Sequence, residues 1–197
     1  MNRLLLIAVI VPATGCPAAK QSVPAANVTV TPQVTVEKAP DPVKWARLGE
    51  SVTIGETKVT LSSVSVGKYR VRSYVEEGEE RDSDDIAIVA RVRIDNLRAT
   101  RNLKYTTWQG VKGVSLVDER GTDYFVIGVY KLGWEVVGSV RSFADAEPGA
   151  SLEDVLRFKP PLAGATTFRL TLPDQRGGDL TGPVPFRFEF TRDDLKK

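Results

Sequence analysis

Histidine is absent from this 197-residue chain, and cysteine occurs once, as Cys16. Without an imidazole the chain cannot assemble a Ser-His-Asp triad, a histidine-ligated zinc site or a histidine acid–base catalyst. The remaining catalytic options, paired carboxylates or a serine with a lysine, show no spacing that indicates an active site. We therefore expect no enzymatic activity and no cofactor.

Neither sign of charge dominates the chain. Lysine and arginine number 27, aspartate and glutamate 25, and the formal net charge is +2. Such a balance creates no sequence-wide field that would attract DNA or RNA, so we expect no nucleic-acid partner. Long apolar runs are scarce as well, because Leu4–Val11, at roughly 8–10 residues, is too short to span a bilayer as a permanent helix.

Residues 1–15 have the organisation of a signal peptide. Arg3 supplies a positive start, Leu4–Val11 an apolar core, and Ala13–Gly15 small residues directly before Cys16. This segment resembles the lipobox of bacterial lipoproteins, in which cleavage falls just before the cysteine and its sulfur carries a diacylglycerol. The resemblance implies palmitate-type acyl chains on Cys16 and an exported protein, lipid-anchored to a bacterial membrane and facing the periplasm or the exterior. Ordinary secretion with removal of Cys16, or an uncleaved anchor, are the alternatives.

Residues 16–44, which begin with the lipidated cysteine, are predicted to form a disordered linker rich in proline, alanine and valine. A stretch of small residues without a large aromatic buries too little surface to offset the entropy of ordering. About 28 residues at ~3.1 Å each could extend to roughly 85 Å. The linker is interpreted as a stalk that holds the following domain clear of the membrane, or as a connection of no tuned length. Its prolines are Pro17, Pro24, Pro32, Pro40 and Pro42.

Residues 45–197 alternate apolar and polar side chains with the period of two that is typical of β-strands. In Ile86–Ile94 the even-numbered residues are expected to face inward and the odd-numbered ones, from Ala87 and Val89 to Arg93, outward. A phase shift in Lys58–Val66 predicts a bulge near Ser62–Ser63. Further strands are predicted at Ser51–Ile54, Tyr69–Val75, Leu103–Thr107, Val114–Val117, Tyr124–Val129, Leu152–Phe158, Thr167–Leu172 and Phe186–Phe190. Many short strands separated by turn signals predict an all-β antiparallel sandwich.

Several turn motifs extend this prediction to a family. Five segments resemble those of an immunoglobulin-like family of bacterial lipoproteins. They are the opening Leu48–Gly55, the strand that ends at Asp95–Asn96, the hairpin Leu116–Tyr124, the turn Glu147–Ser151 and the strand Leu156–Pro161. Most of the family's members have no known function, and some are labelled after telomeric-repeat binding. The resemblance implies an immunoglobulin-like sandwich and no catalytic residues to transfer.

The acidic run at residues 76–85 is a candidate metal site. Asp82, Asp84 and Asp85 supply oxygen ligands close together, as calcium prefers. Their order does not match an EF-hand loop. A solvated hairpin tip is the alternative interpretation.

Arginines at alternate positions form a second candidate site. Arg70 and Arg72 alternate in one predicted strand, and Arg91 and Arg93 in another. If these strands pair, one sheet face is basic and would meet lipid headgroups, an anionic glycan or an acidic partner. The alternative is that these outward charges serve solubility and pair with neighbouring acids.

Tryptophans are the third candidate. Trp134 lies in a glycine-flanked segment and is interpreted either as a surface anchor or as a core residue, whereas Trp108 is expected in the core.

These features predict a non-catalytic envelope lipoprotein that presents a binding or scaffold module to an unknown envelope protein or glycan. The alternatives are a structural envelope protein without a specific ligand, or a calcium-binding adhesion-type module that uses the acidic loop.

Overall fold

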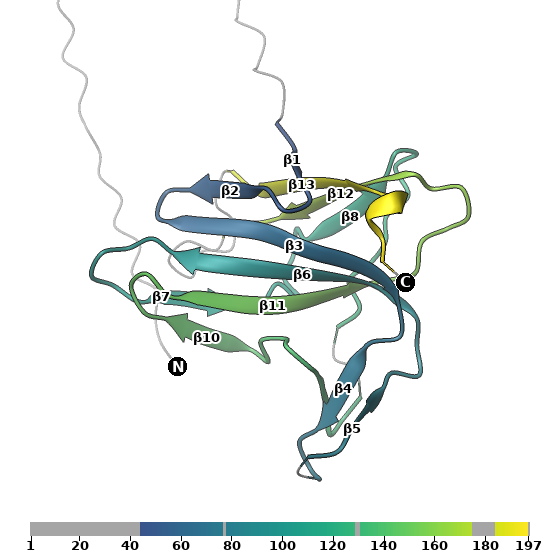
Figure 1. Ribbon diagram of the computed structural model, residues 1–197, viewed down its shortest axis with the longest axis horizontal. Coiled ribbons are helices and arrows are strands. Elements are labelled where there is room, and N and C mark those ends of the chain that lie inside the picture. Colours follow the sequence, from purple (N-terminus) through teal and green to yellow (C-terminus); the bar gives the residue numbers. More distant parts are fainter. Residues whose placement is uncertain (1–43, 77, 129–130, 175–183, 197) are drawn as a thin grey trace, which may run out of the picture. The chain divides into compact units, whose positions relative to one another are not determined.

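The computed structural model describes residues 44–76, 78–128, 131–174 and 184–196, and these fold as an antiparallel β-sandwich (Figure 1). They belong to the second of two units into which the chain divides, Pro42–Lys197. The predicted signal peptide, Cys16 and the linker up to residue 43 lie outside the described residues. Within the described ranges no helix is long and apolar enough to cross a membrane.

Thirteen strands and one short 3-10 turn make up the described fold. They are β1 (Ala46–Arg47), β2 (Ser51–Ile54), β3 (Thr57–Gly67), β4 (Arg70–Ser73), β5 (Glu80–Asp82), β6 (Ala87–Asn96), β7 (Leu103–Thr106), β8 (Ser115–Asp118), β9 (Trp134–Val136), β10 (Phe143–Ala146), β11 (Ser151–Phe158), β12 (Thr167–Leu172), β13 (Phe186–Thr191) and the turn η2 (Arg192–Asp194).

Two four-stranded sheets form the sandwich. One has the order β11-β6-β3-β2, and the other has the order β1-β13-β12-β8, with β1 parallel to β13 and the remaining pairs antiparallel. A single cluster of buried side chains joins them, with Leu61 and Ile88 from the first sheet and Phe168 and Phe188 from the second. The alternating segments predicted at β12 and β13 therefore supply all of their inward residues to this core, namely Phe168, Leu170, Leu172, Phe186, Phe188 and Phe190.

Two smaller sheets complete the fold. β7 pairs with β10, and β4 lies between β5 and β9 in a three-stranded sheet. The three-stranded sheet packs on the outer face of β6 and β11, where Val71 and Val136 meet Val89 and Val155 in a second buried cluster. The sandwich thus has a third layer over part of one face.

The third layer explains where the predicted alternation of β6 fails. Ile88 is buried in the main core and Arg91 and Arg93 are exposed, as predicted. Ala87 and Val89, which were expected to face outward, are buried instead, because the three-stranded sheet covers this end of the strand. A strand covered on both faces is apolar on both, and alternation alone does not reveal the second cover.

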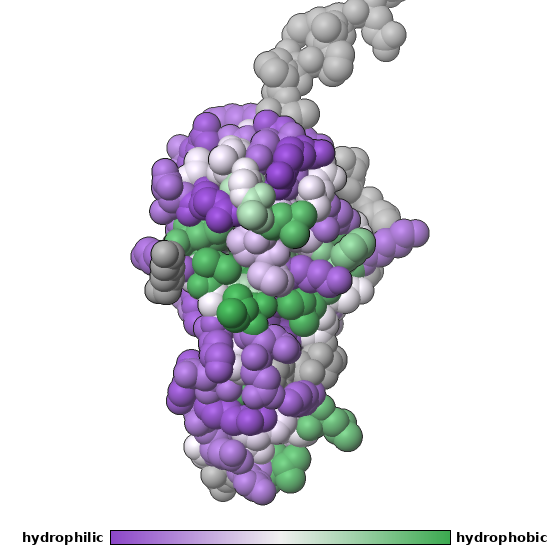
Figure 2. Space-filling view, turned by 90° about the vertical axis from the view of Figure 1, so that its right-hand side faces the viewer, coloured by the Kyte–Doolittle hydropathy of each residue, from purple (hydrophilic) through white to green (hydrophobic). Residues whose placement is uncertain are grey.

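The inward position expected for Ile86 is wrong. Ile86 precedes β6 and is 54% exposed. β6 begins beside the end of β3, where Val66 pairs in register with Ile88. Figure 2 is turned toward this end of the sandwich, and apolar residues gather on the surface between hydrophilic regions. Ile86 is therefore an exposed residue before the start of β6 and does not belong to the core.

The bulge predicted at Ser62–Ser63 is confirmed. The register of β3 against β6 shifts between Leu61 and Ser63, which leaves Ser62 as the extra residue. Its hydroxyl donates a hydrogen bond of 3.0 Å to the carbonyl of Arg91. The shift keeps Leu61 and Val64 both in the core, where a strict alternation would have exposed one of them.

The weaker strand predictions have mixed outcomes. The segment predicted at Tyr69–Val75 shortens to β4, and described residues 124–128 form no strand, only an isolated bridge at Val126. The short strands β1, β5, β9 and β10 were not predicted. Strands of two to four residues carry too few positions for an alternation to be recognised.

Candidate binding site beneath the three-stranded sheet

A pocket of about 230 Å³ opens where the three-stranded sheet meets the sandwich. Its lining comes from Tyr74 just after β4, from β9, from the connection Ser139–Ser142, from Gln109 and from Arg157 of β11. These segments are distant in the chain, and the added layer brings them together.

Two aromatic walls of the pocket are positioned by the pairing of β4 with β9. Ser73 opposes Trp134 in register. The amide of Tyr74 donates to the carbonyl of Gly133, and the amide of Gly133 donates to the Tyr74 hydroxyl oxygen, both at 2.9 Å. Gly133 has φ of 90°, a conformation that favours glycine, and a Cβ there would lie 3.2 Å from the side chain of Val75. Glycine at this position therefore permits the tight turn into β9.

An arginine lies over each aromatic ring. The Arg81 guanidinium is 4.4 Å from the centre of the Trp134 ring, and that of Arg141 is 4.0 Å from the centre of the Tyr74 ring. Such cation–π contacts restrict both partners. Tyr74 is 43% exposed, whereas Trp134 is half-buried and packs against the second buried cluster, so both rings are only partly covered.

Arg157 is fully buried beside the pocket. Its Nη1 donates to the Tyr69 hydroxyl at 2.9 Å and its Nη2 to the carbonyl of Gly128, while Nε has no hydrogen-bond partner among the described residues. No carboxylate of the described residues forms an ion pair with it. Burial of a cation is unfavourable unless the charge is paired. The site therefore contains a positive charge that the described part of the chain does not neutralise.

The basic sheet face predicted from alternating arginines does not form. Arg70 and Arg72 belong to β4 in the three-stranded sheet, whereas Arg91 and Arg93 belong to β6 in the sandwich, and the two strands do not pair. Arg70 and Arg72 both contact Glu80, at 3.6 Å. The prediction failed because alternation places charges on a strand without specifying its neighbour.

Arg93 belongs to a separate ion-pair group that joins β3, β6 and β11. Its Nε lies 2.8 Å from Asp95, which also contacts Lys58 at 3.0 Å and accepts a hydrogen bond from Ser151. Burial alone would raise the pKa of Asp95, but these hydrogen bonds outweigh it and lower the pKa to about 2. This group stabilises the fold, and Arg93 is not part of the pocket.

Part of the acidic run forms a hairpin strand that pairs with β4. Glu80–Asp82 is β5, and Ser83 beyond it is buried, with its hydroxyl accepting from the amide of Tyr69 at 3.0 Å. Asp82 contacts Arg70, and Asp84 contacts Lys131. No group of three or more acidic side chains that could hold a metal occurs in the described ranges. The calcium prediction for Asp82, Asp84 and Asp85 gains no support from this arrangement and stays a prediction.

The two tryptophans lie in different environments. Trp108 is 2% exposed, and its Nε1 donates to the carbonyl of Pro173 at 3.0 Å in the core. Trp134 lines the pocket. Tyr74, Arg141 and Arg157 were not predicted as site residues. The signal available for Arg157 was a lone arginine between Leu156 and Phe158 in an otherwise apolar strand end.

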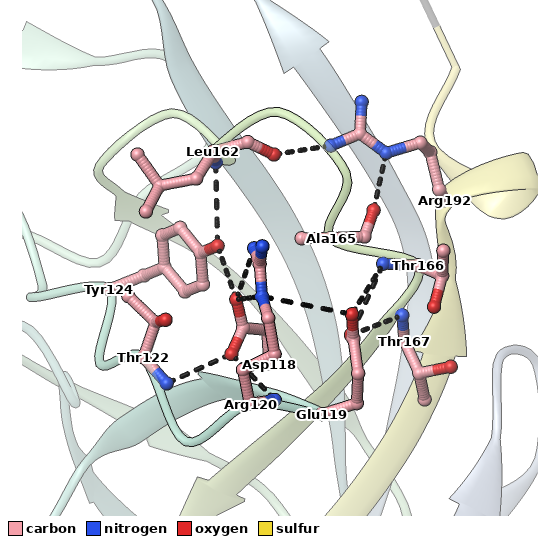
Figure 3. Close-up of polar contacts among 10 residues, drawn as sticks. All are labelled: Asp118, Glu119, Arg120, Thr122, Tyr124, Leu162, Ala165, Thr166, Thr167 and Arg192. Carbon is pink, nitrogen blue, oxygen red and sulfur yellow. Dashed lines mark hydrogen bonds and ion pairs between the residues drawn. The ribbon is translucent and has the colours of Figure 1, made fainter.

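The hairpin Leu116–Tyr124 is held together by hydrogen bonds to two carboxylates, those of Asp118 and Glu119 (Figure 3). Asp118 accepts hydrogen bonds from the amides of Arg120 and Thr122 and from the Tyr124 hydroxyl, at 2.9–3.0 Å. Burial raises its pKa, but these bonds and the Arg120 side chain hold the pKa well below the usual range. Glu119 accepts from the amide of Thr167 at 3.0 Å and so ties the hairpin to β12. All these acceptors are occupied, which suits a turn that fixes the fold.

No protein-family model matches the sequence, and no curated relative matches it. Solved structures with a similar chain course include three bacterial proteins. The YjhA protein of Bacillus subtilis is 14% identical, with a TM-score of 0.45 over 74% of this chain and 98% of that one. The predicted lipoprotein YcdA of B. subtilis is 15% identical, with a TM-score of 0.48 over 73% of this chain and 39% of that one. An uncharacterised β-sandwich protein of Clostridium difficile is 11% identical, with a TM-score of 0.43 over 79% of this chain and 99% of that one. Similarities of this strength assign neither a family nor a function.

Proposed function

We propose that the protein is a non-catalytic binding module of a cell-envelope lipoprotein and that the pocket beneath the three-stranded sheet recognises an envelope glycan. The lipid anchor on Cys16 and export follow from the N-terminal sequence. The absence of histidine from the chain supports a role in binding without catalysis. The proposal includes an immunoglobulin-like fold for the sandwich.

One observation carries the proposal, namely the contiguous aromatic and arginine surface at the pocket. Tyr74 is 43% exposed and Trp134 is half-buried, and cation–π contacts and backbone pairing hold both residues in place. Rigid aromatic side chains at a concave surface are typical of recognition sites, because little conformational entropy is lost on binding. The apolar faces of sugar rings stack on such side chains.

The test is retention of the full-length protein, purified in detergent, on insoluble cell-wall polysaccharide. We expect wild type to co-sediment and Trp134→Ala to lose most of its retention. Trp45→Ala is the matched control, because Trp45 is also half-buried and also lies under an arginine, Arg169, but on the opposite sheet. Equal retention of the two variants would contradict the proposal. Release of soluble sugar fragments from the polysaccharide would contradict the non-catalytic role.

A further inference from the structure

We infer that the pocket selects a carboxylate-bearing sugar, such as a uronic acid residue of an envelope glycan, with Arg141 binding the carboxylate and Arg157 supplying a positive field from beneath. The inference rests on the proposed function and specifies the ligand of the same site.

The first support is the unneutralised charge of Arg157. Its side chain is fully buried, its Nε lacks a partner among the described residues, and no described carboxylate pairs with it. Water screens a buried charge weakly, so at an effective dielectric constant of about 20 its field is roughly fourfold stronger than in bulk water. An anion in the pocket would supply the missing countercharge, and would gain from the field without direct contact with Arg157.

The second support is Arg141, which is positioned for direct contact. It is exposed, lines the pocket and forms no ion pair with the described residues. Its guanidinium is stacked 4.0 Å from the Tyr74 ring centre, which limits its freedom before a ligand arrives. The planar fork of an arginine matches a carboxylate with two parallel hydrogen bonds. A preorganised fork of this kind loses little entropy on binding.

The charges of the lining favour an anion overall. Arg141 and Arg157 provide two positive charges, and Glu135 is the one carboxylate among the described lining residues. Glu135 lies 3.9 Å from Arg72, outside the lining, which partly offsets its charge. The pocket thus keeps an excess of positive charge at neutral pH.

The volume of the pocket and its aromatic walls favour a single sugar ring as the part of the ligand that carries the carboxylate. A volume of about 230 Å³ lies below the roughly 300–1,000 Å³ of typical small-molecule sites, so one ring fits and an oligosaccharide would extend outward. Tyr74 and Trp134 supply apolar faces for that ring. An inorganic anion would satisfy the arginines but leave the aromatic walls unused.

The experiment compares glucuronate with glucose, which share a ring and differ in the carboxylate. Titration of the full-length protein in detergent, followed by calorimetry, should show glucuronate binding at least about tenfold more tightly than glucose. Arg141→Gln should abolish this preference, and because Arg141 is exposed the substitution leaves the core intact. Arg91→Gln is the matched control, an exposed arginine outside the lining that also forms no ion pair with the described residues, and it should keep the preference. Added salt should weaken glucuronate binding and leave glucose binding unchanged.

Several results would overturn the inference. Equal affinity for the two sugars would remove the carboxylate from recognition, and failure of glucuronate to bind by about 10 mM would do the same. Inorganic phosphate or N-acetylglutamate that binds as tightly as glucuronate would show that the ring is not selected. In each case the proposed binding function is judged separately, by retention on the polysaccharide and its loss in Trp134→Ala.

Discussion

Replacing Asp154 with alanine removes the acceptor of four hydrogen bonds inside the sandwich. Asp154 is fully buried in β11. Its Oδ2 accepts from the Tyr105 hydroxyl at 2.6 Å and from the Thr107 hydroxyl at 2.7 Å. Its Oδ1 accepts from the amides of Val140 and Val155, both at 2.8 Å. The alanine variant leaves all four donors without this acceptor.

The expected loss follows from these four contacts. A buried hydrogen bond contributes about 1 kcal/mol net, so the alanine variant should lose about 4 kcal/mol of unfolding free energy. For a domain of this size about 1 kcal/mol corresponds to roughly 2–4 °C, which predicts a melting temperature lower by roughly 8–16 °C. Asp154→Asn should lose less than half as much, because its amide group can donate to the two hydroxyl oxygens.

The stability of wild type relative to Asp154→Asn should also depend on pH. Burial raises the pKa of Asp154, and the hydrogen bonds from Tyr105 and Thr107 only partly oppose this. A carboxyl group whose pKa is higher in the folded state holds more protons when folded. Its contribution is therefore greatest below its unfolded pKa, near 4, and falls as the pH rises through the folded pKa. The advantage of wild type over Asp154→Asn should shrink as the pH rises from 4 to 7.

Urea unfolding followed by circular dichroism measures these differences. Glu153→Ala is the control, because Glu153 is the exposed neighbour on the same strand, and its loss should stay within about 0.5 kcal/mol. An Asp154→Ala variant that loses less than about 1 kcal/mol would refute the reasoning, since the four bonds would then contribute nothing measurable.

Three further predictions concern other parts of the molecule. Ile88→Asp should unfold the domain, because an unpaired charge in the core costs several kcal/mol, whereas Arg91→Asp should leave the circular dichroism melt almost unchanged; equal damage would mean that the orientation of β6 is wrong. Asp95→Asn should lower the free energy of unfolding at pH 7 by at most about 2 kcal/mol, because the pKa of Asp95 is lowered to about 2 in the folded protein. Solvent screening of the exposed partners of Asp95 makes the loss smaller than this limit. This contribution is present above pH ~4 and disappears as the pH falls toward 2, so urea midpoints of wild type and variant should converge in acid. Cys16→Ser should block lipidation and leave the chain unprocessed at that site, which fractionation with labelled fatty acid would detect; wild type that takes up no label but loses its first segment would argue for ordinary secretion.

Much of the sandwich was predictable from single strands. Alternation in β6, β12 and β13 identified the inward residues Ile88, Phe168 and Phe188, because a strand with one buried face must repeat its apolar residues with period two. The bulge in β3 was predictable for the same reason, since Leu61 and Val64 could both be buried only if a residue was inserted between them. The lipobox-like pattern that ends at Cys16 is likewise local in the sequence, and its lipidation stays a prediction.

The candidate site depended on contacts between distant segments. Gly133 and Tyr74 are 59 residues apart, and their hydrogen bond places Trp134 beside β4. Arg157 is buried because the three-stranded sheet covers its side of β11, and that cover is also what buried Ala87 and Val89 against expectation. Periodicity along a strand determines which residues share a face. Which element packs on that face is set by the docking of whole sheets, and for that reason only the tertiary structure brought Tyr74, Arg141 and Arg157 to one pocket.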